Sequence, residues 1–328
     1  MKIFVTGGNG FIGSRVVQEL LKQGYTVRLL LRKTSKTHRL QNLNFEKVYG
    51  DILDTSSLER GMEGCDAAIH LACISSWDQI RNGAMEKVAI SGSQNVFEVA
   101  LEKRIKKLVH VSSAAAVNAA QNPNEVFNER SSFELQNSSL VYAKSKHEVE
   151  KIAQAYFKKG LPIVICNPSE VYGEEDDQLI TAGNLVNIIQ DWPTVMPQGG
   201  TGIVYVGDVA KGITQALQKG KVGERYILSS ENITIAELAK ITLEAAGKKK
   251  KVLQVPNWLL TNIVSLLEKM KVKPPIPSDV LDYAVRYWFV DNSKAKKELG
   301  FNPLPAREAI FRTVQWLHSS GHIKVEYV

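Results

Sequence analysis

The sequence predicts an α/β fold in which a doubly wound parallel sheet is joined to a smaller lobe. Three observations lead to this prediction. A glycine-rich turn follows the first strand-like run, short apolar runs alternate with helical patterns up to about residue 172, and the rhythm changes beyond that point. Strands that alternate with helices form parallel sheets with helices on both faces. Such strands are apolar throughout because both of their faces are buried.

The first element is an apolar run at residues 2–6 that leads into three glycines spaced three apart, Gly7, Gly10 and Gly13. Gly7 allows a sharp turn off the strand, Gly10 leaves room for a pyrophosphate, and Gly13 lets the next helix lie close to the sheet. That helix presents free N–H groups and a positive dipole end to the phosphates. A glycine-rich turn of another α/β protein would not explain all three spacings, so we expect a dinucleotide site.

The residue that follows the second strand, expected at residues 26–31, bears on the choice of cofactor. Sites for NAD usually place Asp or Glu here, on the ribose 2′-hydroxyl. This chain has Arg32, with Lys36 nearby. An acid would repel a 2′-phosphate, whereas a guanidinium binds one through two parallel hydrogen bonds. We therefore expect NADP(H) rather than NAD(H), and we interpret Lys33 as part of a solvated loop.

The remaining elements of the large sheet follow in order along the chain. We expect strands at residues 45–52, 67–72, 107–113 and 162–166, and helices that begin at about residue 54 and span 80–101 and 140–159. Ligands of such sheets bind at the carboxyl ends of the strands. The residues of interest at these ends are Gly7, Arg32, Asp51, Ala72, Ser113 and Asn167.

The segment beyond residue 173 is expected to form the smaller lobe. Its acidic run at 174–177 is interpreted as a solvated loop, because consecutive carboxylates cannot all face one metal ion. Thr234 and Glu237 form a capping box that predicts a helix at 234–246. Other expected elements are a strand and helix at 202–210, a strand at 224–228, and helices at 293–299 and 305–317. We expect a dinucleotide-binding domain at 1–172, with its sheet completed by about 203–230, and a substrate-binding lobe at 173–202 and 231–328.

Residues 256–271 alternate apolar and basic side chains at helical spacing. Two interpretations fit this pattern. The helix could lie on a membrane surface, or it could pack on the substrate-side lobe. The second arrangement is the commoner one, and it is the one that we expect.

The composition is that of an ordinary globular protein, with 44% hydrophobic and 23% charged residues. No apolar run approaches the roughly 18 residues that a membrane span needs, and the N-terminus lacks the layout of a signal peptide. We therefore expect a cytoplasmic protein without a membrane span. The net charge is +7, partly from basic clusters at 103–107 and 248–251. We interpret these as solvated loops and expect no nucleic-acid partner.

The three cysteines, Cys65, Cys73 and Cys166, lie in or beside apolar stretches and lack Cys-x-x-Cys spacing. We therefore expect buried free thiols, with no metal site and no disulfide framework.

The pattern that points to chemistry is Tyr142 followed four residues later by Lys146. Residues at this spacing lie on one face of a helix. A phenol, with a pKa near 10, is a poor acid–base group at neutral pH. A neighbouring ammonium and a positive nicotinamide ring both favour the phenolate, so Tyr142 can exchange a proton while a hydride moves. Ser113, at the end of a strand, is placed to hydrogen-bond the same substrate oxygen.

These motifs resemble those of the extended short-chain dehydrogenases/reductases, in the NAD(P)-dependent epimerase/dehydratase group. Within that group the chain is most similar to the dihydroflavonol 4-reductase-like branch, which includes hopanoid-associated sugar-epimerase-like proteins. The matching stretches lie at 6–13, 26–32, 50–54, 70–72, 111–118, 142–146, 167–173 and 204–210, in family order. The resemblance implies a Rossmann fold, a redox cofactor and a small-molecule substrate.

The resemblance also implies roles for individual residues. Asp51 and Ile52 would flank the adenine, Leu71 and Ala72 would line the cofactor, and the stretch from Pro168 to Val171 would border the nicotinamide. Lys146 would also hold the ribose hydroxyls. The complete expected set is Ser113, Tyr142 and Lys146 for catalysis, and Gly7, Gly10, Phe11, Ile12, Gly13, Arg32, Lys36, Asp51, Ile52, Leu71, Ala72, Tyr142, Lys146, Pro168 and Val171 for the cofactor, with no metal ligand.

Residues that depart from the family pattern limit the types of reaction that we expect. Dehydratases usually carry an Asp-Glu pair after the serine strand, where this chain has alanines at 114–116. Many members have Asn where Ala89 stands. We favour an NADP(H)-dependent carbonyl reductase or alcohol dehydrogenase. The alternatives are a sugar or nucleotide-sugar 4-epimerase with retained cofactor, and a non-catalytic NADP(H)-sensing protein, which would be expected to lose the Tyr–Lys pair.

Aromatic residues in the segments expected around the substrate favour an apolar or ring-shaped carbonyl, alcohol or sugar substrate. They are Trp77, Tyr172, Trp192, Trp258, Tyr283 and Trp288. By resemblance, the helices expected at 80–101 and 140–159 could form a homodimer, provided that their outer faces are apolar.

Overall fold

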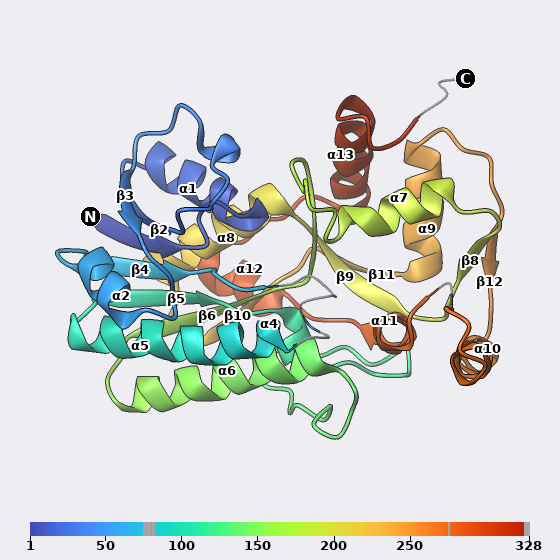
Figure 1. Cartoon of the computed structure of the whole chain (residues 1–328), viewed down its shortest axis with the longest axis horizontal. Coiled ribbons are helices and arrows are strands. Elements are labelled where there is room, and N and C mark those ends of the chain that lie inside the picture. Colours follow the sequence, from blue (N-terminus) through green and yellow to red (C-terminus); the bar gives the residue numbers. More distant parts are fainter. Residues whose placement is uncertain (75–79, 81–82, 275, 325–328) are drawn as a thin grey trace.

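The computed structural model describes residues 1–74, 80, 83–274 and 276–324, and within these residues its main sheet has seven parallel strands (Figure 1). Their order is β10-β6-β5-β4-β1-β2-β3, and each strand is parallel to its neighbours. The strands are β1 (Lys2–Thr6), β2 (Thr26–Leu31), β3 (Glu46–Tyr49), β4 (Ala67–His70), β5 (Lys107–Val111), β6 (Ile163–Pro168) and β10 (Arg225–Leu228). The chain order reverses between β1 and β4, which is where doubly wound sheets bind ligands.

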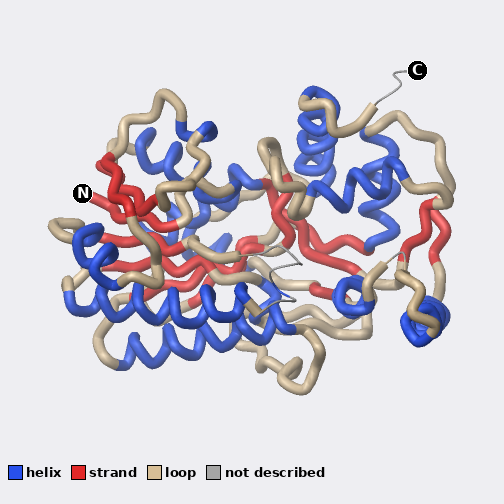
Figure 2. The backbone as a smooth tube through the Cα atoms, viewed as in Figure 1, coloured by secondary structure: helices blue, strands red, loops and turns tan. Residues whose placement is uncertain are grey.

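Helices cover both faces of this sheet (Figure 2). One face packs against α1 (Phe11–Lys22), α8 (Val206–Lys219) and α12 (Ser293–Leu299). The other packs against α2 (Thr55–Met62), α5 (Ser93–Glu102) and α6 (Val141–Lys158). In β1, Ile3 and Val5 belong to the first core and Phe4 to the second. This alternation places apolar side chains on both faces and explains why the run is apolar throughout.

The second part of the chain forms a smaller α/β layer. Within the described residues, β9 (Gly200–Tyr205) is central to a four-stranded sheet with β7 (Glu170–Tyr172), β11 (Glu231–Thr234) and β13 (Tyr287–Trp288). Its core contains α7 (Ala182–Gln190), α9 (Ile235–Ala245) and α13 (Ala306–Ser319). The capping box predicted for α9 is confirmed, with Thr234 and Glu237 bonded reciprocally.

Outlying elements complete this lobe. A parallel ribbon of β8 (Thr194–Met196) and β12 (Val252–Gln254) lies at its outer edge, followed by α10 (Asn257–Lys269) and α11 (Ser278–Ala284), as Figure 1 shows. Isolated bridges from Ala120 to Tyr287 and from Phe127 to Val290 join the polar stretch at 118–139 to the region of β13.

Two expectations for the main sheet are corrected. The third strand ends at Tyr49 rather than near residue 52, and the next residue, Gly50, lies so close to Ser57 that an added Cβ would be 2.1 Å from the serine Cβ. The segment 203–205 belongs to β9 of the second sheet, and β10 alone returns to the main sheet within 203–230. The domain limits expected from the sequence stay a prediction.

The helix expected at 80–101 is interrupted. It contains α4 (Ala84–Lys87), a π-helical turn η2 (Val88–Gly92) and α5. Gly92 lies against Ile52, whose Cδ1 would be 2.4 Å from a Cβ added at Gly92. The helix pattern in the sequence carries no signal for this wider turn. Trp77 lies outside the described residues.

The thiols also differ from expectation. Cys166 is buried, but Cys65 and Cys73 are only partly buried, and all three are free.

Candidate active site

The glycine turn has the shape of a phosphate cradle. Gly7 has φ +73°, and a Cβ there would lie 2.7 Å from the amide nitrogen of Ala72. A Cβ on Gly13 would lie 2.0 Å from the carbonyl oxygen of Gly7. Among the described residues, a Cβ on Gly10 would meet only that same oxygen, at 3.3 Å. Gly7 and Gly13 are therefore required by close packing, whereas Gly10 keeps a face of the turn open.

The first turn of α1 is free of competing anions. Its N-cap, Gly10, provides no side-chain cap, and no acidic residue occurs in the turn. Phe11 and Ile12, which open the helix, are partly buried against the first core. Backbone N–H groups and the helix dipole are the usual ligands of a pyrophosphate, so the residues present fit a dinucleotide cofactor.

The basic loop after β2 presents two exposed cations. Arg32 and Lys36 are exposed, and neither forms an ion pair with another described residue. The Arg32 amide donates to Ser35 Oγ at 3.0 Å and fixes the turn. The side-chain amide of Asn9 donates to the Lys36 carbonyl at 3.2 Å, which joins this loop to the glycine turn. These cations are available to a phosphate.

The acidic turn at 174–177 is not the solvated loop expected from the sequence. Asp177 pairs with Arg39 at 2.7 Å and with His38 at 2.6 Å. Arg15 of α1 pairs with Glu175 at 3.4 Å. The Asp176 carboxylate is buried and accepts from the amides of Thr181 and Ala182, both at 2.9 Å. The turn thus fastens the smaller lobe to α1 and to the basic loop. No local sequence signal distinguishes these roles from solvation.

The residues expected near the adenine are held rigidly. Asp51 Oδ1 accepts from the Leu53 amide at 2.9 Å. Ile52 is only 6% exposed, so its side chain is mostly covered. Asn95, which the sequence analysis missed, donates to the Ile52 carbonyl at 3.1 Å. Its position three residues after the end of η2 carries no distinctive sequence pattern.

A buried histidine supports the ends of β1 and β4. His70 Nδ1 lies 2.7 Å from Thr6 Oγ1, and Nε2 lies 3.0 Å from Ser93 Oγ. The Ala72 amide donates to Thr6 Oγ1 at 3.3 Å, and the Leu71 amide donates to the Thr6 carbonyl at 3.1 Å. Leu71 and Ala72 therefore lie beside the glycine turn, as expected for residues that line a cofactor.

Tyr142 and Lys146 lie in the first turns of α6. Lys146 Nζ is 5.8 Å from the centroid of the Tyr142 ring, and Lys146 is 5% exposed. Burial disfavours the ammonium and acts to lower its pKa. Interactions with the ionised forms of Cys73, Tyr142 and Glu150 act in the opposite direction, and the net shift of the Lys146 pKa is upward. Cys73, which follows the β4 end, is a neighbour of Lys146 that the sequence analysis did not identify.

Ser113 lies two residues after the end of β5 and directly before the 3₁₀ turn η3 (Ala114–Ala116). Its Oγ accepts from the Ala115 amide at 3.2 Å. His147 Nδ1 lies 3.2 Å from the Ala116 carbonyl oxygen, which fastens η3 to α6 one residue after Lys146. The three residues expected in catalysis are therefore carried by two segments that contact each other.

A buried carboxylate, that of Glu150, connects these two segments to the strands of the main sheet. Glu150, one helical turn after Lys146, accepts from Ser112 Oγ and from Asn167 Nδ2, both at 2.5 Å. It also pairs with Arg225 of β10 at 3.1 Å, and Asn167 Nδ2 donates to the Ser113 carbonyl at 2.9 Å. Glu150 thus links α6 to three strand ends. A helical acid four residues beyond a lysine is too common a pattern to have revealed this role.

The substrate side is bordered by aromatic rings. Tyr283 and Trp288 stack with centroids 5.4 Å apart, and the Ala143 amide of α6 donates to Tyr283 Oη at 3.1 Å. Other aromatic residues expected here lie elsewhere: Tyr172 is fully buried in the lobe core, and Trp192 and Trp258 are 77% and 67% exposed. Pro168 ends β6, and Val171 of β7 is buried in the first core.

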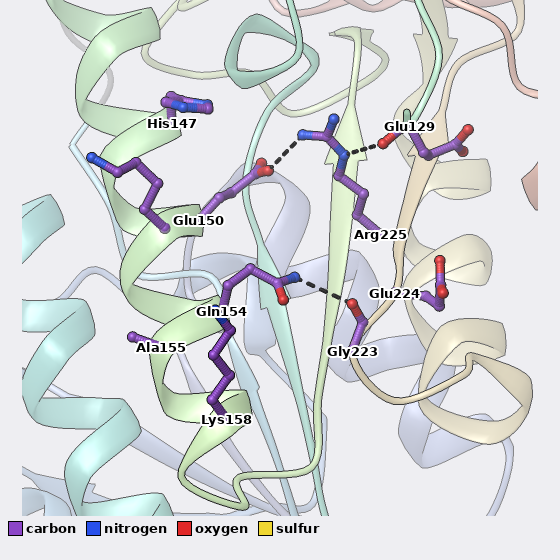
Figure 3. Close-up of a pocket in the computed structure, with 10 residues that line it drawn as sticks. Glu129, His147, Glu150, Gln154, Ala155, Lys158, Gly223, Glu224 and Arg225 are labelled. Carbon is purple, nitrogen blue, oxygen red and sulfur yellow. Dashed lines mark hydrogen bonds and ion pairs between the residues drawn. The ribbon is translucent and has the colours of Figure 1, made fainter. Parts of the chain in front are cut away.

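A separate pocket of about 470 Å³ lies between α6 and β10 (Figure 3). The Glu150–Arg225 ion pair forms part of its wall, and Gln154 Nε2 donates to the Gly223 carbonyl at 3.2 Å. None of the residues expected to bind cofactor or substrate lines it. This hollow is therefore distinct from the candidate active site.

The described residues contain neither a cluster of metal ligands nor a helix that could span a membrane. Within them, no group of three or more His, Cys, Asp and Glu side chains is arranged to hold a metal ion. None of the helices in this part of the chain combines the length and apolarity required to cross a bilayer.

The sequence and the fold are similar to those of known proteins. The sequence model described as the NAD dependent epimerase/dehydratase family matches residues 3–229, more than half of the chain. The chain belongs to the NAD dependent epimerase/dehydratase family. Members of this family are extended short-chain dehydrogenases/reductases, so the chain is an NAD(P)-dependent enzyme of that type. The family resemblance and the α/β fold class inferred from the motifs are confirmed.

Individual relatives match almost the whole chain. The protein named "Putative dihydroflavonol 4-reductase" from Synechocystis sp. is 32% identical, over 98% of this chain and 96% of its own length. Sterol demethylase protein B from Methylococcus capsulatus is 27% identical, over 98% and 100%. The crystal structure of gox2253 superposes with a TM-score of 0.88 at 30% identity, covering 98% of this chain and 99% of that one.

Proposed function

We propose that this family member is an NADP(H)-dependent carbonyl reductase or alcohol dehydrogenase with Ser113, Tyr142 and Lys146 as its catalytic residues. The observation that carries the proposal is the buried ammonium of Lys146 near the Tyr142 ring, 5.8 Å from its centroid. A buried ammonium in contact with a phenol is suited to stabilising the phenolate that forms when the phenol gives up its proton. The name of the Synechocystis relative also supports a reductase.

Tyr142, Lys146 and Ser113 would each have a separate role in the reaction. When bound, the nicotinamide cofactor would supply the hydride. Tyr142 donates its phenolic proton to the substrate oxygen, and Lys146 stabilises the phenolate that remains. Ser113 donates a hydrogen bond to the same oxygen as negative charge develops on it. In alcohol oxidation each of these proton movements runs in reverse.

NADP(H) is the proposed cofactor because Arg32 and Lys36 are exposed cations without an ion-pair partner among the described residues. A 2′-phosphate would pair with both, whereas the 2′-hydroxyl of NAD(H) would leave their charges unused. Gly7, Gly10 and Gly13 would hold the pyrophosphate, as their geometry permits. The remaining expected cofactor residues, including Asp51, Pro168 and Val171, keep the roles inferred from the family resemblance.

An apolar, ring-bearing carbonyl compound is the proposed substrate class. The support comes from the stacked Tyr283 and Trp288 beside the start of α6. It also comes from the relative named as a sterol demethylase protein. Aromatic rings bury large flat areas of apolar ligands.

The proposal also covers the oligomeric state of the protein and its location in the cell. A homodimer through α5 and α6 is part of the proposal. The exposed side chains of α6 include the apolar Val141, Ala155 and Phe157, whereas those of α5 are polar. A cytoplasmic location remains part of the proposal.

A thermal-shift screen with NADPH, NADP⁺, NADH and a panel of ketones and alcohols tests the proposal. Binding to the folded state raises the melting temperature by mass action. We expect the largest shifts with NADPH and NADP⁺, and NADPH oxidation with at least one ring-bearing ketone. Protein that purifies with tightly retained NAD and shows no net turnover would instead support the 4-epimerase alternative.

A further inference from the structure

Helix α10 exposes an apolar face that the described residues of the chain leave uncovered. Among the described residues of the helix, only Val264 is buried. Trp258 is 67% exposed, Leu266 58%, and Met270, which caps the helix, 63%. At 100° per residue these side chains, with Leu259 and Ile263, occupy an arc of roughly 140°. The sequence predicts a helix packed on the lobe, but the structure leaves most of the apolar surface of α10 exposed.

The same corner of the molecule exposes further apolar side chains. Trp192, which precedes β8, is 77% exposed, and Leu253 of β12 is 48% exposed. Because β8 pairs with β12 and α10 follows β12, these residues belong to one region at the outer edge of the lobe (Figures 1 and 2). Val272, after the helix, is 47% exposed. We call the set Trp192, Leu253, Trp258, Leu259, Ile263, Leu266, Met270 and Val272 the α10 face.

Lysines surround the α10 face. They are Lys248, Lys249, Lys250, Lys251, Lys269, Lys271 and Lys273. The acidic side chains in the same segments are Asp191 and Glu268, so positive charge predominates. Lys250 also donates to the Ile189 and Asp191 carbonyls at 2.6 and 3.0 Å, which places the lysine cluster beside Trp192. On the helix, Lys269 falls within the angular range of the apolar face, whereas Glu268 falls outside it.

We propose that the α10 face docks on an anionic phospholipid surface. Its apolar centre would enter the boundary between headgroups and acyl chains, its lysines would meet the lipid phosphates, and its two tryptophans would lie at the level that indole prefers. A second copy of the chain is a poorer partner, since a two-fold contact would bring the same lysines against each other. The proposal concerns binding only and does not depend on the reaction proposed above.

The place of the α10 face gives docking a consequence for the active site. Helix α10 packs against α11, and Tyr283 of α11 accepts a hydrogen bond from the Ala143 amide next to Tyr142. The docked face would thus be one helix away from the aromatic side of the candidate site. An apolar substrate dissolved in the bilayer would have a short path to it.

Co-sedimentation of the full chain with vesicles tests the proposal. Vesicles of phosphatidylcholine alone are compared with vesicles of equal parts phosphatidylcholine and phosphatidylglycerol. We expect binding to the anionic vesicles to be at least about tenfold stronger, and to weaken in high salt because exposed charges are screened. Equal partition into both kinds of vesicle, or no binding to either, would overturn the proposal.

Two double variants, each with a control, separate the contribution of charge to vesicle binding from the contribution of apolar contact. Lys269→Glu/Lys271→Glu should reduce binding to anionic vesicles at least about tenfold. Lys296→Glu/Lys297→Glu makes the same charge change on α12 and should have little effect. Trp258→Ala/Leu266→Ala should also release the protein, whereas Phe157→Ala/Val222→Ala, which removes exposed apolar groups elsewhere, should not.

Folding and self-association are measured on the same samples. All substituted side chains are exposed, so unchanged melting curves are expected. Light scattering without lipid reports the oligomeric state. A dimer abolished by Trp258→Ala/Leu266→Ala, together with absent vesicle binding, would assign the α10 face to a second copy and refute lipid docking. Equal loss of binding in the α10 and control variants would refute it as well.

Discussion

Lys146 is a buried lysine whose pKa is raised by neighbouring groups despite its burial. Burial alone would favour the neutral amine, but the groups around it, on Cys73, Tyr142 and Glu150, move its pKa upward. The side chain therefore stays an ammonium at neutral pH while it is 5% exposed. A positive charge on Lys146 beside Tyr142 favours the phenolate that forms when the phenol gives up its proton.

Arg32 should determine the preference between cofactors. Arg32→Ser is expected to weaken NADP⁺ binding about tenfold or more, because a charge-assisted hydrogen bond to a phosphate contributes about 1.5–3 kcal/mol. The affinity for NAD⁺ should stay nearly constant. Titration calorimetry measures both. Lys33→Ser is the matched control, and the assignment fails if the arginine variant loses both cofactors equally.

His110 is a buried histidine without a polar partner. Neither of its ring nitrogens has a hydrogen bond within the described residues. Its ring stacks on His70 with centroids 5.4 Å apart and meets Phe97 edge-on. Burial, together with the nearby His70 and Lys146, holds the pKa of His110 well below its usual value. Burial also lowers the pKa of His70 to about 3.

These two histidines should make the fold sensitive to acid. The unfolded chain binds protons near pH 6.5, whereas the folded chain resists them, so stability is full above about pH 6.5 and falls as the pH drops toward 3. His70 should cost about 2 kcal/mol at about pH 5, and His110 should add to this loss because its pKa is lowered as well. Urea denaturation at several pH values should show that His110→Leu reduces this acid-dependent loss. An unchanged pH dependence in the variant would rule out the explanation.

At the scale of elements, α6 depends on contacts that cross the sheet. Glu150 joins the helix to Ser112 of the β5 end, to Asn167 of β6 and to Arg225 of β10. Arg225 also donates to the Glu129 and Ser131 carbonyls, at 2.8 and 3.1 Å. The polar stretch at 118–139 is thereby tied to the same network. The position of Tyr142 and Lys146 relative to Ser113 follows from these bonds.

Removal of the Glu150 carboxylate should be strongly destabilising. Glu150→Ala leaves the largely buried guanidinium of Arg225, with 18% of its side chain exposed, without its counter-ion. Breaking one partner of a buried pair typically costs about 3–5 kcal/mol. Glu148→Ala, two residues earlier in an exposed pair with Lys151, should cost less than about 1 kcal/mol. Urea denaturation compares the two, and similar losses would contradict the role given to Glu150.

Short sequence motifs predict the elements whose structure depends on residues adjacent in the chain. The Thr234–Glu237 capping box and the glycine turn were predicted correctly, because each is encoded within a few adjacent residues. The sequence does not predict the π-helical turn at 88–92, where Gly92 packs against Ile52 from a distant part of the chain. The ion pairs of the acidic turn at 174–177, which also join distant parts of the chain, were missed as well.

At the scale of the whole molecule, alternation of strands and helices was enough to predict the main sheet. It could not assign β9, because an apolar strand followed by a helix fits either sheet. Its pairing with β7, β11 and β13 is decided by partners far apart in the sequence. Likewise the amphipathic pattern of 256–271 predicted a helix, but only the assembled lobe shows which face of α10 lacks a partner.

The molecule as a whole brings a phosphate cradle and a phenol–ammonium pair to one region at the switch in strand order. The central claim is that Tyr142 moves the proton in a cofactor-linked redox reaction. Turnover by Tyr142→Phe, measured as NADPH oxidation with a ketone that the wild type reduces, tests it most directly. The account predicts unchanged NADPH affinity and a loss of about 10²–10⁴-fold in kcat, with normal turnover in the exposed control Tyr49→Phe. Wild-type turnover by Tyr142→Phe would contradict the account.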